Sequence, residues 1–251
     1  WLKAGIMEDG KLLFPEAGTP QGGVLSPLLA NIALHGFETF VSRTRRKHRV
    51  VVIRYADDFV ILCDDLDTLT EAIAHAEEWL APMGLRIKAA KTHITHTLNP
   101  HQGQVGFEFL GFNVRQYPVS QHRSHQRHAG YKTLIQPSRT AVQRHLRELK
   151  ATIRRLRGAP QAALVAELNP KIRGWTLYYQ TCVAKRTFSK LDSLLYYKLS
   201  RWAYYRHKRK TAGWRHHRYW KRPGTRDEFT DGTNTVIRYE AMPITRHVKV
   251  K

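Results

Sequence analysis

The sequence has 251 residues, of which 42% are hydrophobic and 25% charged, so an intrinsically disordered chain is excluded and one large domain or two ordinary ones are expected. No stretch approaches the ~18 consecutive apolar residues of a membrane span, and no N-terminal segment has the pattern of a secretory signal. The formal net charge of +22 favours a polyanionic partner.

The positive charge is confined to the second half of the chain. Residues 1–112 carry 11 Lys/Arg and 13 Asp/Glu, a balance of −2, whereas residues 113–251 carry 31 Lys/Arg and 7 Asp/Glu, a balance of +24. A charge run often forms only a solvated face, but an excess of this size repels itself unless a polyanion compensates it. We therefore expect chemistry in the first half and polyanion binding in the second.

The first half predicts helices mixed with strands. Ser26 followed by proline can begin a helix over 27–42, and its broad apolar surface predicts that this helix is largely buried. Residues 50–63 are two apolar, β-branched runs around Asp57 and Asp58, a pattern typical of a β-hairpin with its turn at the acids.

The same mixture continues towards residue 114. Asp67 can cap the next helix, which Pro82 and Gly84 would end. Short strands are expected at 85–88, 92–95 and 107–114. Strands and helices without regular alternation predict the α+β class.

Beyond residue 135 the pattern becomes helical. Ser138 can cap one helix, Asn169 followed by proline can begin a second, and a third is expected from about Thr187. All three have an apolar face and a basic outer face, which predicts a small helical bundle. Residues 207–226 are polar, aromatic and basic.

Asp57 and Asp58 are the strongest candidates for chemistry. Adjacent carboxylates at a turn repel each other, and an isolated pair usually marks nothing more than a solvent-exposed turn. Here the flanking strands are so apolar that a buried sheet with two acids at its end is expected, and a divalent cation would neutralise them. Carboxylate oxygens suit Mg²⁺, and two such ions about 3.5–4 Å apart can activate a hydroxyl and stabilise leaving pyrophosphate.

Five short segments carry the most specific signal in the sequence. Residues 18–32 read GTPQGGVLSPLLANI, and residues 55–58 read YADD. They are followed by Gly84-Leu85 with Lys91-Thr92, by FEFLGF at 107–112, and by LNPKIRGW at 168–175 with Tyr178-Tyr179. In this order the segments resemble the motifs of group II intron-encoded reverse transcriptases and maturases, over most of 18–205.

The resemblance implies a partial polymerase palm, an antiparallel sheet with helices, followed by an all-α thumb or maturase bundle. The expected divisions are a palm at 1–118, a basic linker at 119–134, a helical thumb at 135–210, and a basic tail at 211–251 that leads towards a DNA-binding or endonuclease region. The first palm motif, with a third metal-binding Asp, and the fingers domain would lie before Trp1. We therefore expect this chain alone not to polymerise DNA, whereas its full-length parent does.

Residue roles follow from the same resemblance. Asp57 and Asp58 would be the catalytic metal ligands. The segment Pro20-Gln21-Gly22 would lie against the incoming nucleotide and templating base, and Lys91 near the triphosphate. Phe109-Leu110-Gly111 would form the primer grip. Basic residues expected to contact RNA are Arg144, Arg147, Arg154, Arg155, Arg173, Arg206, Lys208, Arg209 and Lys210, with Trp214, Tyr219 and Trp220 stacking on unpaired bases.

The expected function is thus RNA-directed DNA polymerisation by two Mg²⁺ ions, together with intron RNA maturation. The partners would be RNA template, structured intron RNA, a DNA primer or target and dNTPs, without a membrane, in a bacterial-type cytoplasm near the nucleoid. One alternative is a non-enzymatic RNA-binding splicing factor that keeps the palm as a scaffold, which the intact acids and Gln21-Gly22 disfavour. Another is a cellular defence reverse transcriptase, which residues 168–179 argue against.

Overall fold

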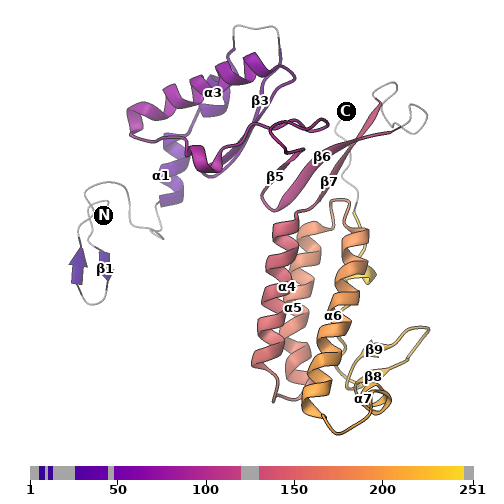
Figure 1. Cartoon of the computed structure of the whole chain (residues 1–251). Helices are drawn as coiled ribbons and strands as arrows, with labels where there is room; N and C mark the ends of the chain where they lie inside the picture. Colours follow the sequence, from indigo (N-terminus) through magenta and orange to yellow (C-terminus); the bar gives the residue numbers. More distant parts are fainter. Residues whose placement is uncertain (1–5, 9–10, 14–25, 45–47, 120–129, 246–251) are drawn as a thin grey trace. The chain divides into compact units, whose positions relative to one another are not determined.

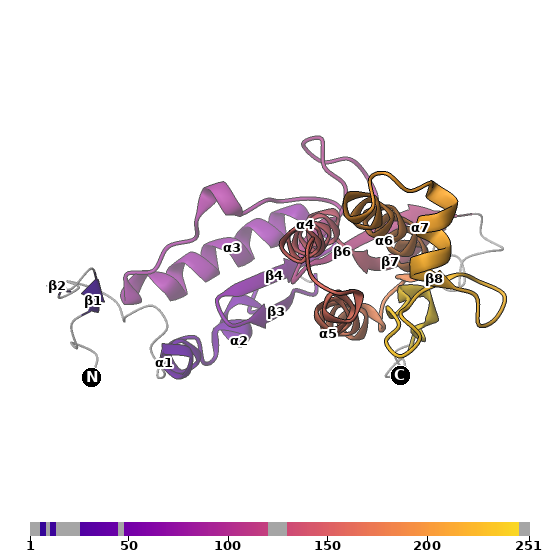
Figure 2. The ribbon, with the colours of Figure 1, turned by 90° about the horizontal axis from the view of Figure 1, so that it is seen from below.

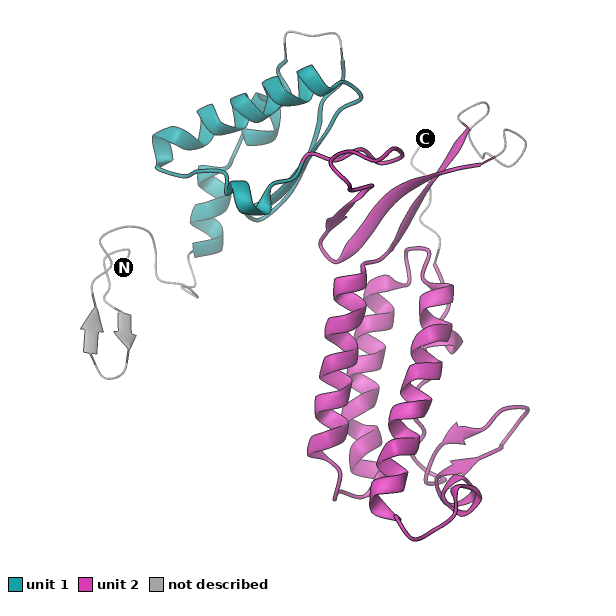
Figure 3. Ribbon diagram, viewed as in Figure 1, with its two compact units in different colours: residues 1–93 teal, residues 94–251 magenta. Residues whose placement is uncertain are grey.

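The computed structural model describes residues 6–8, 11–13, 26–44, 48–119 and 130–245. They belong to two compact units, residues 1–93 and 94–251 (Figures 1 and 3). The chain begins with an antiparallel pair, β1 (Ile6–Glu8) and β2 (Lys11–Leu13). Helices and small antiparallel sheets together confirm the α+β class.

The first unit is built on one β-hairpin covered by helices. Its elements are α1 (Ser26–Ala33), α2 (Phe37–Val41), β3 (Val51–Tyr55), β4 (Asp58–Leu62), α3 (Leu66–Leu80) and the 3-10 turns η1 (Ala81–Met83) and η2 (Ala89–Lys91). The core lies where α2 and α3 meet the hairpin, and Phe37, Val41, Ala72 and Ala76 are completely buried there. The expected hairpin at 50–63 is confirmed, with β3 and β4 in antiparallel register.

The single helix expected over 27–42 is broken in the structure. Gly36 takes a φ of +87°, which ends α1 and starts α2 in a new direction. A side chain at Gly36 would be strained by the positive φ, whereas its Cβ would make only an ordinary contact with the ring of Trp79, at 3.4 Å. The expectation of burial is wrong for α1, where Leu28 and Ile32 are 56% and 62% exposed, because only α2 reaches the core.

Two further expectations for the first half are corrected. Asp65, not Asp67, caps α3, because its carboxylate accepts both the backbone N–H and the hydroxyl of Thr68 (2.8 and 2.6 Å). The helix end at Pro82 and Gly84 is confirmed, and Gly84 has a φ of +70°. The segments 85–88 and 92–95 are not strands: the described chain there is irregular around the turn η2.

The second unit joins a three-stranded sheet to a helical bundle. The sheet has the order β5 (Phe107–Phe109), β6 (Phe112–Pro118) and β7 (Tyr131–Pro137), all antiparallel. The bundle consists of α4 (Arg139–Arg155), α5 (Gln161–Tyr179) and α6 (Lys185–Arg206), seen nearly end-on in Figure 2. Its centre is filled by apolar side chains of all three helices, among them Leu149, Leu164, Ile172, Phe188 and Leu199.

The structure differs from the expected bounds of the basic linker and of the second helix of the bundle. The described end of the 119–134 segment belongs to β7, which pairs with β6 from Tyr131 onward, so the linker expectation is wrong there. Helix α5 begins at Gln161, eight residues before Asn169, and runs through Pro170. Asn169 does not cap a helix but ties down a later segment: its side chain bonds the carbonyl of Thr235 and the N–H of Ile237, both at 2.9 Å.

The expected basic tail is folded back onto the bundle as far as Thr245. It forms α7 (Ala212–Tyr219), the strand pair β8 (Trp220–Lys221) and β9 (Glu228–Phe229), and the turn η4 (Tyr239–Ala241). Tyr219, Phe229, Val236 and Tyr239 are all buried in the bundle core. The expectation of a basic tail is therefore wrong for residues 211–245, because apolar side chains spaced along this segment complete the core of the bundle. No described helix is long and apolar enough to span a membrane.

Candidate functional site

The acidic pair lies at the tip of the β3–β4 hairpin. Tyr55 pairs with Asp58 across the hairpin, so the turn itself consists of Ala56 and Asp57. Ala56 has a φ of +55°, a region that costs an L-residue roughly 1–2 kcal/mol. Such strain concentrates at functional turns, where the fold holds side chains in a set direction. Here it places two adjacent, exposed carboxylates at the end of the sheet.

Arg54 holds this turn against the helices. Its Nε donates to Glu38 of α2 at 2.7 Å, and its Nη1 donates to Asn31 of α1 at 3.3 Å and to the carbonyl of Ala56 at 3.0 Å. The Arg54 side chain is only 14% exposed, so these are sheltered, charge-assisted contacts. One guanidinium therefore connects the strained turn to both preceding helices, which the sequence did not indicate.

The hairpin has one packed face and one open face. Val52, Phe59 and Ile61 pack on the core formed with α2 and α3. On the other face Ile53 is 47% exposed and Tyr55 is 65% exposed, and the side chain of Asp58 shares this face by strand alternation. The expectation of a sheet buried on both faces is thus wrong for the described part of the unit.

Asp57 and Asp58 suit a divalent cation as part of its ligand set. Both are hard oxygen donors on a constrained turn, which leaves coordination positions for water and phosphate. Within the described ranges no group of three or more His, Cys, Asp or Glu side chains could hold a metal ion.

Of the other expected nucleotide-site residues, only Lys91 lies in the described part of the chain. Lys91 lies exposed at the end of η2, and among the hydrogen bonds and ion pairs of the described residues none connects it to Asp57 or Asp58. Pro20, Gln21 and Gly22 lie outside the described residues.

The expected primer-grip residues form the tight turn between β5 and β6. Leu110 and Gly111 both have positive φ angles, 50° and 79°, as a two-residue hairpin turn with matching twist requires. The hydroxyl of Tyr178 donates to the carbonyl of Leu110 at 2.8 Å, and that of Tyr179 donates to the carbonyl of Gly111 at 3.1 Å. Two motifs that are far apart in the sequence are therefore one structural element.

Gly111 is required there for steric reasons as well. A Cβ on Gly111 would lie 2.7 Å from the hydroxyl of Tyr179. The Gly111 carbonyl also accepts the backbone N–H of Ser138 at 2.8 Å, which joins the turn to the start of α4. Burial, and next the neighbouring Tyr178, raise the pKa of Tyr179 to about 12, so its hydroxyl stays a donor.

Most of the basic residues expected to contact RNA are exposed on the second unit. These are Arg144, Arg147, Arg154, Arg155, Arg173, Lys208, Arg209 and Lys210. Arg155 also pairs with Glu167 of α5. Arg206 differs: its Nη1 donates to the carbonyl of Ala159 at 2.6 Å, and its guanidinium lies 4.9 Å from the ring centre of Trp202. This half-buried group connects α6 to the loop before α5, and its contact with RNA stays a prediction.

The aromatic residues of 214–220 are corrected in part. Tyr219 and Trp220 are each 5% exposed, and they pack on Trp202 and Phe229 respectively. They cannot stack on bases without unfolding the bundle. Trp214 is 39% exposed, with the Lys210 ammonium 5.4 Å from its ring centre, and it alone of the three is available.

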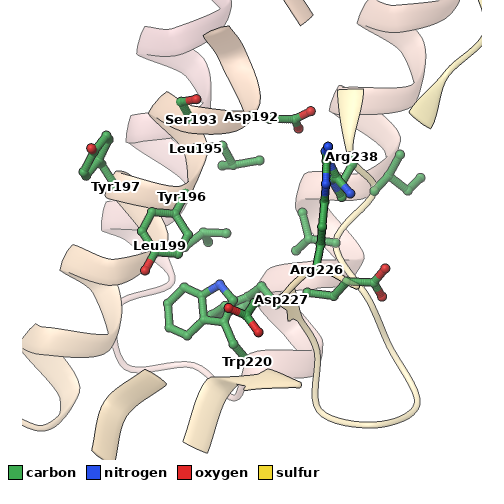
Figure 4. A pocket seen from close by; sticks show the side chains of 14 residues that line it. Asp192, Ser193, Leu195, Tyr196, Tyr197, Leu199, Trp220, Arg226, Asp227 and Arg238 are labelled. Carbon is green, nitrogen blue, oxygen red and sulfur yellow. The ribbon is translucent and has the colours of Figure 1, made fainter. Parts of the chain in front are cut away.

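One hollow in the second unit lies between α6 and the folded-back segment 220–238, with a volume of about 420 Å³ (Figure 4). Several of its charged groups have partners within the protein. Arg226 and Arg238 both pair with Glu240, at 3.0 and 3.1 Å. The carboxylate of Asp192 accepts the backbone N–H groups of Tyr239 and Glu240, at 2.9 and 2.8 Å. These contacts fasten the segment 220–238 to the bundle along the hollow.

Two protein families match this chain. Residues 1–114 match the family described as reverse transcriptase (RNA-dependent DNA polymerase), and residues 142–220 match the group II intron, maturase-specific domain. The first range contains the acidic hairpin, and the second contains most of the three-helix bundle.

Individual relatives match shorter parts. Protein YkfC of Escherichia coli (strain K12) is 32% identical over 144 residues, which are 45% of this chain and 36% of that protein. Group II intron-encoded protein LtrA of Lactococcus lactis subsp. cremoris is 51% identical over 47 residues, 19% of this chain and 8% of that protein. An uncharacterized 91 kDa protein in the cob intron of Schizosaccharomyces pombe is 24% identical over 244 residues, 71% of this chain and 30% of that protein. The chain thus spans about a third or less of these relatives. Over these two ranges the chain is therefore similar to reverse transcriptases and to the maturase-specific domain of group II introns.

Proposed function

We propose that this chain carries the metal-binding hairpin and primer grip of an RNA-directed DNA polymerase, and that the same protein binds structured intron RNA as a maturase. This proposal rests mainly on the position of Asp57 and Asp58, which lie on a strained turn that Arg54 holds against two helices. What distinguishes this pair from an ordinary solvent-exposed turn is the strained Ala56 and the contacts of Arg54. The family of residues 1–114 supports the same assignment.

In the proposed reaction each part of the chain positions one reactant. Asp57 and Asp58 would hold Mg²⁺, which when bound activates the primer hydroxyl and neutralises the leaving pyrophosphate. Phe109-Leu110-Gly111 would hold the primer end, and its bonds to Tyr178 and Tyr179 keep that turn in place. Pro20-Gln21-Gly22 would contact the nucleotide and template, and Lys91 the triphosphate. The reactants are dNTPs, an RNA template and a DNA primer.

The number of acidic ligands among the described residues bears on whether this chain polymerises DNA by itself. Two carboxylates are fewer protein ligands than a two-ion site requires, and the described residues supply no third acid beside them. We therefore expect no processive primer extension from this chain alone, with Mg²⁺, RNA template, DNA primer and dNTPs present. Processive extension under these conditions would contradict the proposed ligand set.

The decisive test uses the full-length protein that contains this chain. Asp57→Asn and Asp58→Asn should each abolish primer extension and leave RNA binding unchanged, because the exchange removes a metal-binding charge and keeps the side-chain shape. Asp64→Asn is the matched control: Asp64 is an exposed acid just beyond the far end of β4, hydrogen-bonded to His48. Full extension by either of the first two variants would refute the metal role.

The maturase part of the proposal rests on the second unit and is tested separately. Its net charge and its exposed arginines and lysines suit phosphate contacts along structured RNA. Splicing assays with Asp57→Asn distinguish the two activities: splicing without extension is expected if RNA binding and polymerisation use different surfaces. Such a protein would act in a bacterial-type cytoplasm, at the nucleoid where its RNA and DNA meet.

A further inference from the structure

A second groove runs between α4 and α6, and it is lined by cations. Its volume is about 480 Å³, and its floor is formed by Ile153, Leu194 and Trp202. Five basic residues line its sides: Lys150, Arg154, Arg157, Lys198 and Arg201. Two tyrosines complete the lining, Tyr197 and Tyr205. No carboxylate is among the lining residues.

The opposite side of α4 shows that this arrangement is not imposed by the basic composition. Between α4 and α5, Glu148 pairs with Lys171 and Arg155 pairs with Glu167, so that seam matches its charges. Among the salt bridges of the described residues, none involves any of the five cations of the α4–α6 groove. Of the two seams that α4 makes, the one with α6 is strongly positive.

Positive groups facing each other across two packed helices destabilise the free protein. Burial, and next the charge of Lys150 on α4, lower the pKa of Lys198 on α6, which agrees with this repulsion. A bound anion between the helices would remove the repulsion. The groove therefore has the charge distribution of a site whose occupant is a polyanion.

The tyrosines indicate which polyanion. Tyr197 is 69% exposed at the edge of the groove, so its ring face is open to a flat partner. Tyr205 lies under Arg157, whose guanidinium is 4.2 Å from the ring centre, and its hydroxyl accepts a 3.3 Å bond from Arg201. These contacts fix the directions of two guanidinium groups. Ordered cations beside an open aromatic ring are typical of sites for unpaired nucleic acid.

We propose that the α4–α6 groove binds a single-stranded stretch of RNA, with phosphates along the five cations and one base stacked on Tyr197. The axes of packed helices lie about 8–10 Å apart, so the groove between them admits one strand and not a duplex. A base within a duplex would also hide its face from Tyr197. The assignment rests on the proposed RNA-binding function and extends it by naming the strand type and its place.

The test measures binding of a labelled, unstructured RNA oligonucleotide to the full chain over a range of salt concentrations. The double change Lys150→Gln with Lys198→Gln should weaken binding and reduce the log–log salt slope by about 1.4, since each phosphate contact to a single strand contributes about 0.7. Lys190→Gln is the matched control, because Lys190 is an exposed lysine of α6 outside the groove lining. Equal behaviour of the groove and control variants would overturn the proposal.

Tyr197 provides an independent arm. Tyr197→Leu should weaken binding about tenfold, within the range expected for one stacked base, whereas Tyr197→Phe should bind like the original protein. A hydroxyl-dependent loss, seen as weak binding by Tyr197→Phe, would contradict stacking. Tighter binding of an RNA duplex, or of single-stranded DNA of the same sequence, would overturn the assignment to single-stranded RNA.

The stability of the free protein separates a binding role from a structural one. Without RNA, the double lysine variant should melt at the same temperature or higher, because a repulsion has been removed, and RNA should raise its melting temperature less than that of the original protein. A lower melting temperature without RNA would show that the lysines serve the fold. If the original chain binds no RNA at all, the maturase proposal fails. If the original chain binds RNA and the groove variants bind it equally well, only the assignment to the groove is excluded.

Discussion

The hydroxyl of Tyr179 donates to the carbonyl of Gly111 at 3.1 Å, across 68 residues of sequence. Tyr178 does the same for Leu110, so the last turn of α5 holds both residues of the β5–β6 turn. The aromatic ring of Phe112 then packs on both tyrosines, with centroids 5.2 and 5.0 Å apart. The turn expected to hold a primer end is therefore positioned by the maturase-type bundle.

Gly111→Ala should destabilise the second unit by about 2 kcal/mol or more. The substitution forces a Cβ into a positive-φ conformation and to within 2.7 Å of the Tyr179 hydroxyl. Chemical denaturation of the purified chain measures the change. Gly174→Ala is the matched control, because Gly174 lies within α5 with open space around it, and Ala there should be neutral or stabilising by up to ~1 kcal/mol. Equal denaturation midpoints for the two variants would contradict this account.

Arg54→Lys should impair polymerisation through metal binding. Lysine keeps the charge but cannot hydrogen-bond to Glu38, Asn31 and the Ala56 carbonyl at the same time. The turn that carries Asp57 and Asp58 therefore loses contacts that hold it in place. Losing about 1–2 kcal/mol of such contacts corresponds to roughly a tenfold higher Mg²⁺ concentration for half-maximal primer extension by the full-length protein. RNA affinity should not change. An unaltered Mg²⁺ dependence would show that Arg54 does not position the carboxylates.

The free energy of unfolding should fall as the pH drops from about 6.5 to 4. Burial lowers the pKa of His145 to about 4, and its ring is stacked on Trp175 and hydrogen-bonded to Tyr239 at 2.5 Å. In this pH range His145 binds a proton in the unfolded chain but stays neutral in the folded chain. The free energy of unfolding therefore falls on acidification, by up to roughly 3 kcal/mol. Denaturant titrations at several pH values measure it. His145→Gln should flatten the slope; an identical slope would assign it to other groups.

RNA binding by the whole chain should weaken steeply between low and moderate salt. Each neutralised phosphate releases counterions, so several contacts from the exposed cations of α4 and α6 would give a large negative slope of log affinity against log salt. Fluorescence anisotropy with structured RNA at 50–200 mM salt tests this. An affinity that hardly changes across this range would rule out the electrostatic account for the second unit.

Local signals in the sequence predicted most single elements. The hairpin at 50–63 followed from two β-branched runs around a polar turn, and Ser138 was correctly expected to cap α4, since its hydroxyl accepts the N–H of Ala141 at 3.1 Å. The cap of α3 was misplaced by two residues because Asp65 and Asp67 both suit the position. Only the approach of Thr68 to Asp65 decides between them.

Long-range contacts explain what the sequence did not predict. The role of Arg206, for example, depends on the loop before α5, which is distant from it in the sequence. Tyr219 and Trp220 have the composition of a base-stacking surface, and their burial follows from partners on α6 and β9. Side-chain type alone cannot separate an aromatic residue that meets a base from one that meets a distant helix.

Residues 212–245, which fold back onto the bundle, determine what a C-terminal deletion of this protein would show. Asn169 and Asp192 fasten it by four hydrogen bonds, and Tyr239 is wholly enclosed. A chain shortened at Arg206 would leave Trp202 and Phe188 open to water, and it would aggregate or degrade. Lost splicing in such a truncation would report a collapsed bundle rather than a missing contact with the intron, so point substitutions on the surface are the sound way to assign its RNA contacts.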